Sequence, residues 1–235
     1  MVRSLLFYSL VLSAGSLAAQ NATPRYSSGW GDVAWTAGGA LVAGAALIAR
    51  PPLSRCAPCD SLGLPGYERV AIRSNSSGAR TASTVLLLGI AGGVALASVT
   101  HVDGARARGN AAVMADAVSW TVAATELLKV GVHRARPALY RAGAPMAATD
   151  PDNRESFPSG HTSLAFAAAT AYTTLALRQH LPHGERNAIL FYVAAAAVGV
   201  LRVDGGKHFP SDVLAGAALG SGIGWATARL HAMRP

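Results

Sequence analysis

Long apolar segments alternate with short polar breaks along most of the chain. Each segment is rich in Ala, Leu and Val, and each is longer than an ordinary β-strand. The pattern therefore predicts an all-α protein with six helices. We place them at Val33–Ala49, Thr84–Thr100, Ala111–Leu128, Thr162–Leu177, Ala188–Val200 and Val213–Leu230.

Several of these segments are slightly shorter than the ~20 residues that a helix needs to cross a bilayer. Their small residues, as in LLLGIAGGVALAS, are typical of close helix–helix contact within a membrane. Asp116 and Glu126 lie in the third segment, and a carboxylate at the bilayer centre costs roughly 2.5–3.5 kcal/mol. We expect a membrane-embedded bundle in which these carboxylates face inward or have partners. A soluble or peripheral periplasmic bundle is the alternative.

The composition supports one domain that contacts lipid or phosphate rather than nucleic acid. The 235 residues are 51% hydrophobic and only 14% charged, with a mean hydropathy of +0.31. The net charge of +8 is spread over the breaks between apolar segments, with no dense tract of Lys and Arg. This distribution favours anionic lipid head groups or phosphorylated substrates as partners and gives no reason to expect nucleic acid.

The first residues, MVRSLLFYSLVLSAGSLAAQ, resemble a bacterial secretory signal. Arg3 precedes an apolar stretch, and small residues at Ser16 and Ala18 suit a cleavage site. We predict a signal peptide over residues 1–19, with an uncleaved anchor helix as the alternative. The protein is then expected in the bacterial cell envelope, at the inner membrane or, alternatively, in the periplasm.

The two cysteines, Cys56 and Cys59, form a single Cys-x-x-Cys pair in RCAPCD. A disulfide, a redox pair or half of a zinc site would all fit this spacing, but no second pair completes a zinc site. We predict a small staple within a loop. The surrounding break, from Arg50 to Ser83, is expected to be an ordinary exposed loop.

Three polar clusters stand at the ends of predicted helices. Lys129 closes the third helix in KVGVHRARP, and Arg136 follows it. PSGH opens the fourth helix, and RVDGGKHFPSD joins the fifth to the sixth. If the helices run up and down through a bundle, all three clusters meet at one end.

The residue types in these clusters suit a tetrahedral oxyanion. Lys129, Arg136 and Arg202 are permanent cations, and the planar fork of Arg matches phosphate oxygens. The backbone N–H groups of Ser159 and Gly160 lie where the start of a helix points at an anion. The simpler alternative is that the cations only flank the ends of membrane helices and that the serine only caps a helix.

Two histidines add reactive groups to this end. His208 and Asp212 are four residues apart, so they share one face of a helix, where Asp212 could hold one imidazole nitrogen and leave the other free to attack. His161 could give a proton to a leaving group. His208 and Asp212 could instead form a structural pair. A metal held by the two histidines and the aspartate is disfavoured by the three neighbouring cations.

These motifs together resemble a known family. Lys-x6-Arg-Pro from Lys129, Pro-Ser-Gly-His ending at His161, and Arg-x5-His-x3-Asp from Arg202 resemble the signature of the type 2 phosphatidic acid phosphatases. That superfamily also includes bacterial acid phosphatases and vanadium haloperoxidases. The resemblance covers about Ala111 to Leu230. It implies a six-helix bundle with a catalytic core over residues 111–235. N-terminal helices and a loop, over residues 20–110, precede this core in the chain.

The resemblance also implies roles for the site residues. His208 would be the nucleophile that forms a phosphohistidine, Asp212 would orient it, and His161 would protonate the leaving oxygen. The phosphoryl group would be held by Lys129, Arg136, Ser159, Gly160 and Arg202. No metal or cofactor is implied, although vanadate could bind as a phosphate mimic. One departure is Leu201, which stands where the family usually has Ser and removes one expected hydrogen bond to phosphate.

We therefore expect a metal-independent phosphatase that hydrolyses phosphomonoester or pyrophosphate groups, with a lipid phosphate as substrate and membrane lipids around it. The alternatives are a vanadium-dependent haloperoxidase and a catalytically silent membrane protein. The first would use the same oxyanion site for a different reaction.

Overall fold

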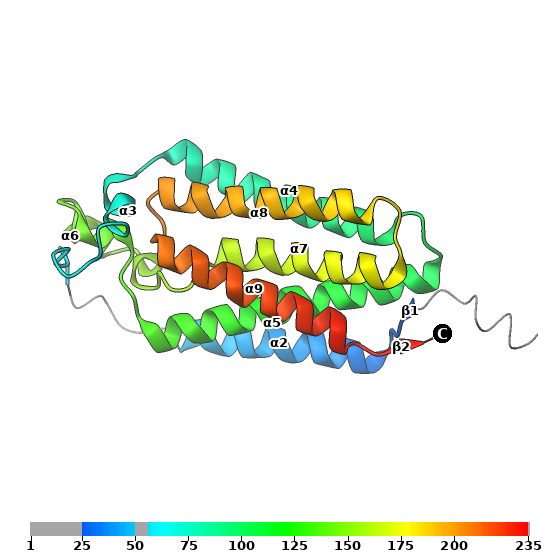
Figure 1. Ribbon diagram of the computed structural model, residues 1–235. Helices are drawn as coiled ribbons and strands as arrows, with labels where there is room; N and C mark the ends of the chain where they lie inside the picture. The colour runs from blue at the N-terminus through cyan, green and yellow to red at the C-terminus, as the bar shows by residue number, and fades with distance from the viewer. Residues whose placement is uncertain (1–24, 50–55, 235) are drawn as a thin grey trace, which may run out of the picture.

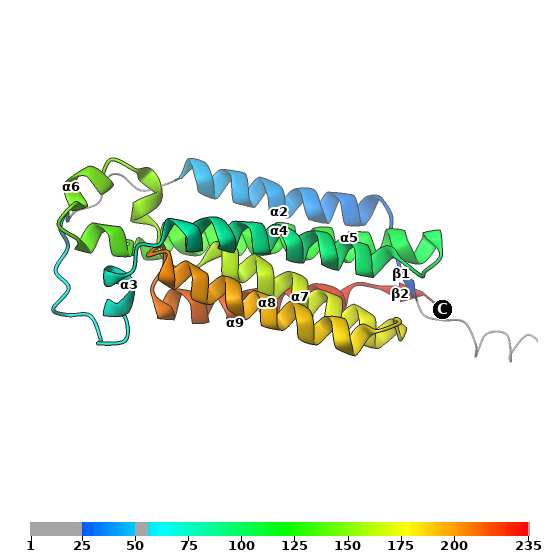
Figure 2. The same ribbon diagram turned by 90° about the horizontal axis from the view of Figure 1, so that it is seen from above.

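The computed structural model describes residues 25–49 and 56–234. Its long helices lie side by side in an elongated bundle, with α2 along one side (Figures 1 and 2). The long helices are α2 (Trp30–Ile48), α4 (Ser77–Val99), α5 (Gly104–Val132), α7 (Gly160–Gln179), α8 (Gly184–Asp204) and α9 (Pro210–Leu230). The predicted signal segment, residues 1–19, lies outside the described residues.

The predicted all-α class is confirmed, and each apolar segment lies mainly within one long helix. The described residues form eight α-helices rather than six, because α3 (Arg69–Arg73) and α6 (Ala144–Ala147) are short helices in the polar breaks. The breaks also contain the 3₁₀ turns η1 (Pro137–Tyr140) and η2 (Pro151–Arg154). Two short strands, β1 (Arg25–Tyr26) and β2 (Met233–Arg234), pair antiparallel near the C-terminus.

Polar side chains fix where two of the long helices begin. Asp103 accepts hydrogen bonds from the backbone N–H groups of Ala105 and Arg106, at 3.0 and 2.9 Å, and so caps α5. Ser76 caps α4 by accepting from the N–H of Ala79 at 3.1 Å. These caps satisfy N–H groups that have no partner within the helix. As a result, α4 and α5 begin seven residues before the apolar segments that predicted them.

Helices α7 and α9 are in close contact through small residues. Gly216, Gly220 and Gly224 recur every fourth residue on the face of α9 that meets α7. A Cβ atom at Gly216 would lie 2.7 Å from the carbonyl oxygen of Ser159, and one at Gly220 would overlap the carbonyl of Ser163. Only glycine permits this approach, which is the small-residue packing of membrane helices. The contact fixes the start of α7 relative to the start of α9.

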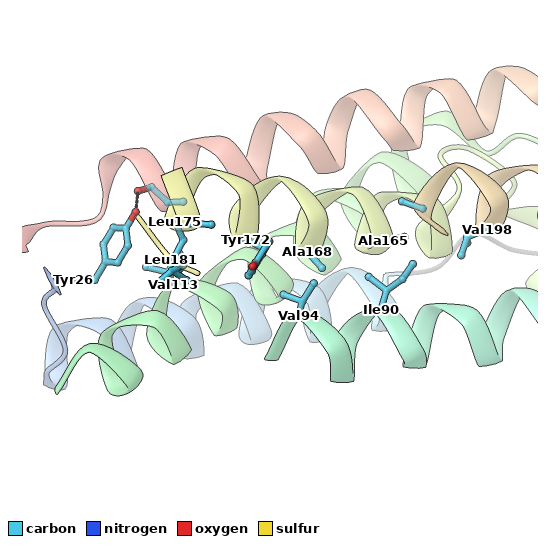
Figure 3. Close-up of a cluster of buried hydrophobic side chains, with 13 residues drawn as sticks. Tyr26, Ile90, Val94, Val113, Ala165, Ala168, Tyr172, Leu175, Leu181 and Val198 are labelled. Carbon is cyan, nitrogen blue, oxygen red and sulfur yellow. Dashed lines mark hydrogen bonds between the residues drawn. The ribbon is translucent and has the colours of Figure 1, made fainter. Parts of the chain in front are cut away.

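The apolar core runs along the middle of the bundle (Figure 3). Val94, Val113, Tyr172 and other side chains from α4, α5, α7 and α8 are buried there. Tyr26 enters the core from β1 and donates its hydroxyl hydrogen to the carbonyl of Ala228 at 2.9 Å. The short strand is therefore part of the packed structure.

The outer surface of the bundle is strongly apolar. Large side chains face outward, including Leu41 on α2, Leu88 on α4 and Val193 on α8, which are 74%, 66% and 65% exposed. Within the described part of the chain, four helical segments are long and apolar enough to cross a membrane: Trp30–Ile48, Ser77–Val99, Gly104–Tyr140 and Gly184–Asp204. Such a surface suits lipid better than water.

The two carboxylates of the third segment are buried and have partners. Asp116 is 2% exposed and accepts a hydrogen bond from Thr36 Oγ1 at 2.5 Å. Glu126 contacts Lys129 Nζ at 2.6 Å. Each acidic group thus has a polar partner inside the protein, as expected for a membrane-embedded bundle.

The segment before α4 is more than an exposed loop, so that expectation is wrong. Cys56 and Cys59 form a disulfide, which confirms the predicted loop staple. The N–H of Cys59 donates to the carbonyl of Leu139 at 2.8 Å and attaches the loop to η1. Glu68 is only 2% exposed and pairs with Arg134 at 3.0 Å. The loop therefore supplies a buried charge to the end of the bundle where the three motifs meet.

Candidate active site

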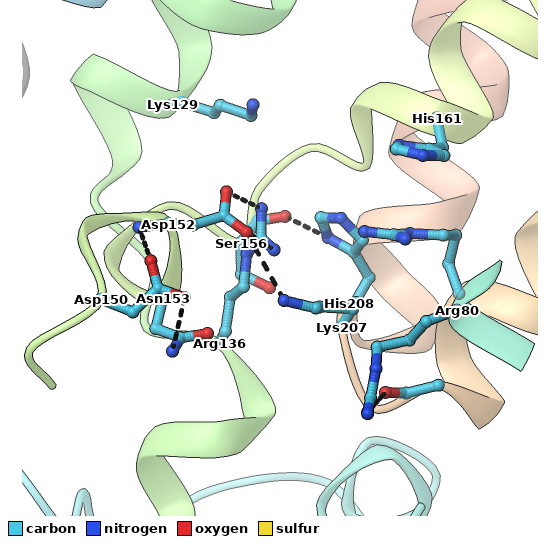
Figure 4. A network of polar contacts seen from close by, with 12 residues as sticks. Arg80, Lys129, Arg136, Asp150, Asp152, Asn153, Ser156, His161, Lys207 and His208 are labelled. Atoms are coloured by element: carbon cyan, nitrogen blue, oxygen red, sulfur yellow. Dashed lines mark hydrogen bonds and ion pairs between the residues drawn. The ribbon is translucent and has the colours of Figure 1, made fainter. Parts of the chain in front are cut away.

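One end of the bundle gathers the three predicted clusters. Helices α5 and α8 end there, and α7 and α9 begin there, so the up-and-down arrangement brings Lys129, His161 and His208 together (Figures 1 and 4). A Cβ atom at Gly160 would lie 3.9 Å from Lys129 Nζ, which places the second motif against the first. The convergence expected from the sequence is therefore present.

The three cations of this end are buried. Lys129, Arg136 and Arg202 are 9%, 3% and 6% exposed. Each has a polar neighbour, but the Nε atoms of Arg136 and Arg202 have no hydrogen-bond partner among the described residues. Buried positive charge with unused donors is costly unless an anion is bound. The arrangement is suited to an oxyanion.

The His208 side chain is held with one nitrogen free. Its Nδ1 lies 2.7 Å from the carbonyl oxygen of Ser156, and a carbonyl can only accept, so Nδ1 carries the hydrogen. Nε2 therefore keeps its lone pair. Burial lowers the pKa of His208 well below its ordinary value, and Arg136 and Arg202 lower it further. A neutral imidazole with a free nitrogen beside cations can attack an electrophilic phosphorus.

Asp212 supports His208 in a less direct way than predicted. Its Oδ2 lies 3.7 Å from His208 Nδ1, which is too far for a hydrogen bond. This oxygen instead accepts from Ser156 Oγ at 2.5 Å and from the N–H of Phe209 at 2.8 Å. Asp212 thus fixes Ser156, and the carbonyl of Ser156 holds His208. The expectation of a direct contact is corrected accordingly.

Arg134 completes this support and was not identified from the sequence. Its guanidinium donates to Asp212 Oδ1 at 2.6 Å and to Glu68 Oε2 at 3.0 Å. It also donates to Ser211 Oγ at 2.6 Å, and it lies 4.3 Å from the centre of the Phe209 ring. The sequence offered only a second arginine two residues before Arg136, with nothing to separate their roles.

His161 lies at the start of α7, across the site from His208 (Figure 4). Its Nε2 is 3.1 Å from Thr84 Oγ1, a contact that the sequence did not predict. Burial, followed by the charges of Arg202, Arg136 and Lys129, lowers the pKa of His161 to about 4. The imidazole is therefore neutral at pH 7 in the free protein, and a bound anion would raise its pKa.

The expected role of the Ser159 backbone is wrong in one respect. Its N–H donates to the carbonyl of Asp212 at 3.0 Å and so is not available to a phosphate oxygen. Its hydroxyl pairs with Thr162 Oγ1 at 2.9 Å. Leu201, at the position where a serine was expected, is half-buried on α8. Arg202 Nη1 donates instead to the hydroxyl of Ser83 on α4, at 3.4 Å.

An unpredicted carboxylate also lies in the site. Asp152 contacts both terminal nitrogens of Arg136, at 2.5 and 2.8 Å, and lies 3.7 Å from Lys207 Nζ (Figure 4). Burial acts to raise the pKa of Asp152, but Arg136 and Lys207 outweigh it and hold the pKa below its ordinary value. Asp152 is thus a carboxylate anion that contacts both terminal nitrogens of the Arg136 guanidinium.

A helical bundle with a neutral histidine beside a set of buried cations at one end has the features of an oxyanion-binding protein. Comparison with known proteins identifies the family. The profile of the PAP2 superfamily matches residues 111–235, which is more than half of the chain. The chain belongs to the PAP2 superfamily, as its motifs predicted.

Three bacterial relatives share part of the sequence, and each is named lipid A 1-phosphatase. The protein from Rhizobium etli is 34% identical over 109 residues, 45% of this chain and 44% of the relative. The protein from Porphyromonas gingivalis is 40% identical over 72 residues, 29% of this chain and 15% of the relative. The protein from Rhizobium johnstonii is 37% identical over 78 residues, 33% and 29% of the two chains. The chain therefore spans less than half the length of these relatives. No solved structure gives a significant match.

Proposed function

We propose that the protein is a metal-independent phosphatase that acts on lipid phosphates through a phosphohistidine intermediate. The observation that carries the proposal is the free Nε2 of His208, an uncharged nucleophile in the middle of three buried cations. The cations Lys129, Arg136 and Arg202 would stabilise the negative charge on the transferring phosphoryl group. Gly160, at the start of α7, would let a phosphate oxygen approach the helix.

The reaction would take place in two steps. The bound phosphate raises the pKa of His161, so this imidazole is protonated when the substrate is in place. In the first step, His208 Nε2 forms a bond to phosphorus as the bond to the leaving oxygen breaks, and the protonated His161 gives that oxygen its proton. In the second, His161 takes a proton from water, whose oxygen attacks phosphorus and breaks the N–P bond. Inorganic phosphate leaves and both imidazoles return to their starting state. Asp212, Ser156 and Arg134 would hold His208 in place throughout.

A lipid phosphate is the substrate class that best suits the molecule. The site lies at the end of a bundle whose outer face is apolar, with four helices able to cross a membrane. Relatives that share part of the sequence are named lipid A 1-phosphatase, which denotes an activity on a phosphorylated lipid. We place the protein in a bacterial membrane, where the substrate would reach the site from the lipid phase.

Phosphate release by the purified, detergent-solubilised protein tests this function. Substrates would be phosphatidic acid, lipid A and the soluble p-nitrophenyl phosphate, with initial rates measured in excess EDTA. We expect activity on the lipids to persist, because protein cations supply the positive charge. Vanadate should inhibit competitively, since it mimics the five-coordinate transition state.

Two results would overturn the proposal. One is complete loss of initial rate in EDTA, measured well below the melting temperature of the chelated protein, with recovery on adding a divalent metal. The other is a lack of inhibition by millimolar vanadate. Bromide oxidation with vanadate and peroxide, measured on the same preparation, would instead support the haloperoxidase alternative.

A further inference from the structure

A second cluster of ionisable groups lies far from the candidate active site. It is formed by Asp32 of α2, Asp116 of α5 and His231, which follows α9. One ligand atom from each residue lies within 4.8 Å of the other two. The cluster is close to the paired strands β1 and β2, at the opposite end of the bundle from α3 and α6 (Figure 1). The proposed phosphatase reaction uses none of these residues.

Each carboxylate of the cluster uses one oxygen to attach itself to the fold. Asp32 Oδ2 accepts from the N–H of Gly29 at 2.7 Å, and Asp116 Oδ1 accepts from Thr36 Oγ1 at 2.5 Å. The remaining oxygens face the imidazole. Asp32 Oδ1 is 3.3 Å from Nε2 of His231, and Asp116 Oδ2 is 3.5 Å from Nδ1. Both carboxylates are thus oriented with one oxygen directed at the same ring.

The imidazole is oriented by a backbone carbonyl. His231 Nε2 is 2.9 Å from the carbonyl oxygen of Ser27, so Nε2 carries a hydrogen. Without a second hydrogen, Nδ1 presents a lone pair to the carboxylate oxygen of Asp116. Two acceptors that face each other in a buried place require a cation, either a proton or a metal ion.

The separation favours a metal ion. At 3.5 Å, Nδ1 and Asp116 Oδ2 are further apart than the atoms of an ordinary N–H···O hydrogen bond, which are about 2.7–3.2 Å apart. Ligands about 2.0–2.1 Å from a tetrahedral Zn²⁺ lie roughly 3.3–3.4 Å from each other. The spacing between Nδ1 and Asp116 Oδ2 is close to this ligand–ligand distance. Asp32 approaches the ring from the side of Nε2 and offers a third ligand atom within 4.8 Å of the other two, so it would move toward the ion on binding. A cavity of about 480 Å³ adjoins all three side chains and has room for water as a further ligand.

We propose that Asp32, Asp116 and His231 form a structural site for a divalent transition metal such as Zn²⁺. An imidazole nitrogen with two carboxylates suits this class of ion, and the two negative charges balance its charge. The N–H of Gly29, the hydroxyl of Thr36 and the carbonyl of Ser27 orient the three ligands in the way that outer contacts support metal sites. The ion would join α2, α5 and the segment after α9.

Metal binding to the stripped protein tests the site. The purified protein would be treated with chelator, dialysed and titrated with Zn²⁺ at pH 7.5, with bound metal and melting temperature both measured. We expect one Zn²⁺ that survives gel filtration and raises the melting temperature. Co²⁺ in its place should give the visible absorption of a protein-bound ion. These readouts do not depend on phosphatase activity, so either proposal can fail without the other.

Matched variants separate this site from accidental binding to surface histidines. Asp32→Asn and His231→Gln should each weaken Zn²⁺ binding at least tenfold. Asp32 is only partly buried, so its variant is the one expected to fold normally. His101→Asn removes an exposed histidine between α4 and α5 and should bind as the parent does. Equal binding by the parent and both cluster variants would overturn the proposal. So would a parent that Zn²⁺ does not stabilise, because a protonated His231 would then balance the carboxylates.

Discussion

The two ends of the bundle hold buried histidines in the same way and surround them with opposite charges. His208 donates its Nδ1 hydrogen to the carbonyl of Ser156, and His231 donates its Nε2 hydrogen to the carbonyl of Ser27. In each case a backbone carbonyl selects the tautomer and leaves the second nitrogen free. The free nitrogen of His208 lies among cations, whereas that of His231 faces the carboxylate of Asp116.

This difference sets the chemistry of each imidazole. Burial and then the neighbouring arginines lower the pKa of His208, which stays neutral and can attack an anionic phosphate. The contact with the Asp116 carboxylate is the main cause that raises the pKa of His231, against the effect of burial. The surroundings of the His231 imidazole therefore stabilise a cation bound to it. The sign of the surrounding charge, and not the way the ring is held, therefore decides whether the free nitrogen is suited to attack a phosphate or to bind a cation.

The largest expected effect is the loss of the nucleophile. His208→Ala should remove turnover and should leave no acid-labile phosphoenzyme on rapid quenching, because no other imidazole among the described residues of this end is held in the same way. The exposed His101, changed to Asn, is the control and should keep the parent rate. A phosphoenzyme that survives in His208→Ala would place the nucleophile elsewhere.

Replacing the second histidine of the same end should have an effect that depends on the leaving group. His161→Ala should slow hydrolysis of an alkyl lipid phosphate by roughly 10²–10⁴-fold, the usual contribution of general acid catalysis. The loss should be much smaller for p-nitrophenyl phosphate, whose leaving group departs without a proton. Equal losses on both substrates would show that His161 is not the acid.

The pH dependence gives a second measurement of the same residue. The pKa of His161 in the free protein is about 4, so its protonated fraction falls about tenfold for each pH unit above this value. The ratio of kcat/KM between the parent and His161→Ala, on the lipid substrate, should therefore fall as the pH rises from 5 to 7. Taking the ratio cancels the titration of the substrate. A ratio that does not change with pH would contradict the assignment.

The helix contact that positions the active-site end should be sensitive to a single methyl group. Gly220→Ala places a Cβ against the carbonyl of Ser163, so α7 and α9 must separate, at a cost of about 1–3 kcal/mol. Gly222→Ala, on the same helix with nothing within 4 Å, is the matched control. Thermal or denaturant unfolding would compare the two. Equal stabilities would show that the close approach contributes little.

The smallest expected effect is an opposite response of the two ends to acid. His231 has a raised pKa in the folded protein, so its stabilising contribution is complete below the unfolded pKa of about 6.5 and is lost as the pH rises through the folded value. In chelator, His231→Gln should therefore be most destabilising near pH 6 and less so at higher pH. His208, whose pKa is lowered, should make the fold less stable as the pH falls below about 6.5. Melting temperatures of His231→Gln and His208→Ala, each compared with the parent above and below pH 6.5, would test the contrast.

The sequence predicted the long helices well, because an uninterrupted apolar run of this length has few other stable structures. It placed their ends less well. The polar start of α5, which includes Arg106 and Asn110, does not look like part of an apolar helix, yet Asp103 caps it and Asn110 is buried. The strands β1 and β2 are two residues each and depend on a contact between distant parts of the chain.

The candidate site could be predicted as far as charge and spacing define it. Lys129, Arg202 and His208 stand at helix ends in a pattern that chance explains poorly. The roles of Ser156 and Glu68 could not be predicted. Ser156 acts through its backbone carbonyl, which any residue has, and Glu68 reaches Arg134 from a loop 66 residues earlier in the chain. Such contacts depend on the folded arrangement rather than on a local pattern.

The carboxylate of Asp152 has a consequence for how tightly the site can hold its product. Asp152 meets Arg136 with two parallel contacts, the same geometry in which a phosphate oxygen pair would bind. When a phosphoryl group binds to the two terminal nitrogens of Arg136, this side chain exchanges Asp152 for the phosphoryl group. The affinity of the site for phosphate therefore reflects only the difference between the two ionic contacts. When inorganic phosphate departs, Arg136 already has a replacement within reach. For the proposed phosphatase, weak inhibition by inorganic phosphate is the expected outcome of such an internal competitor.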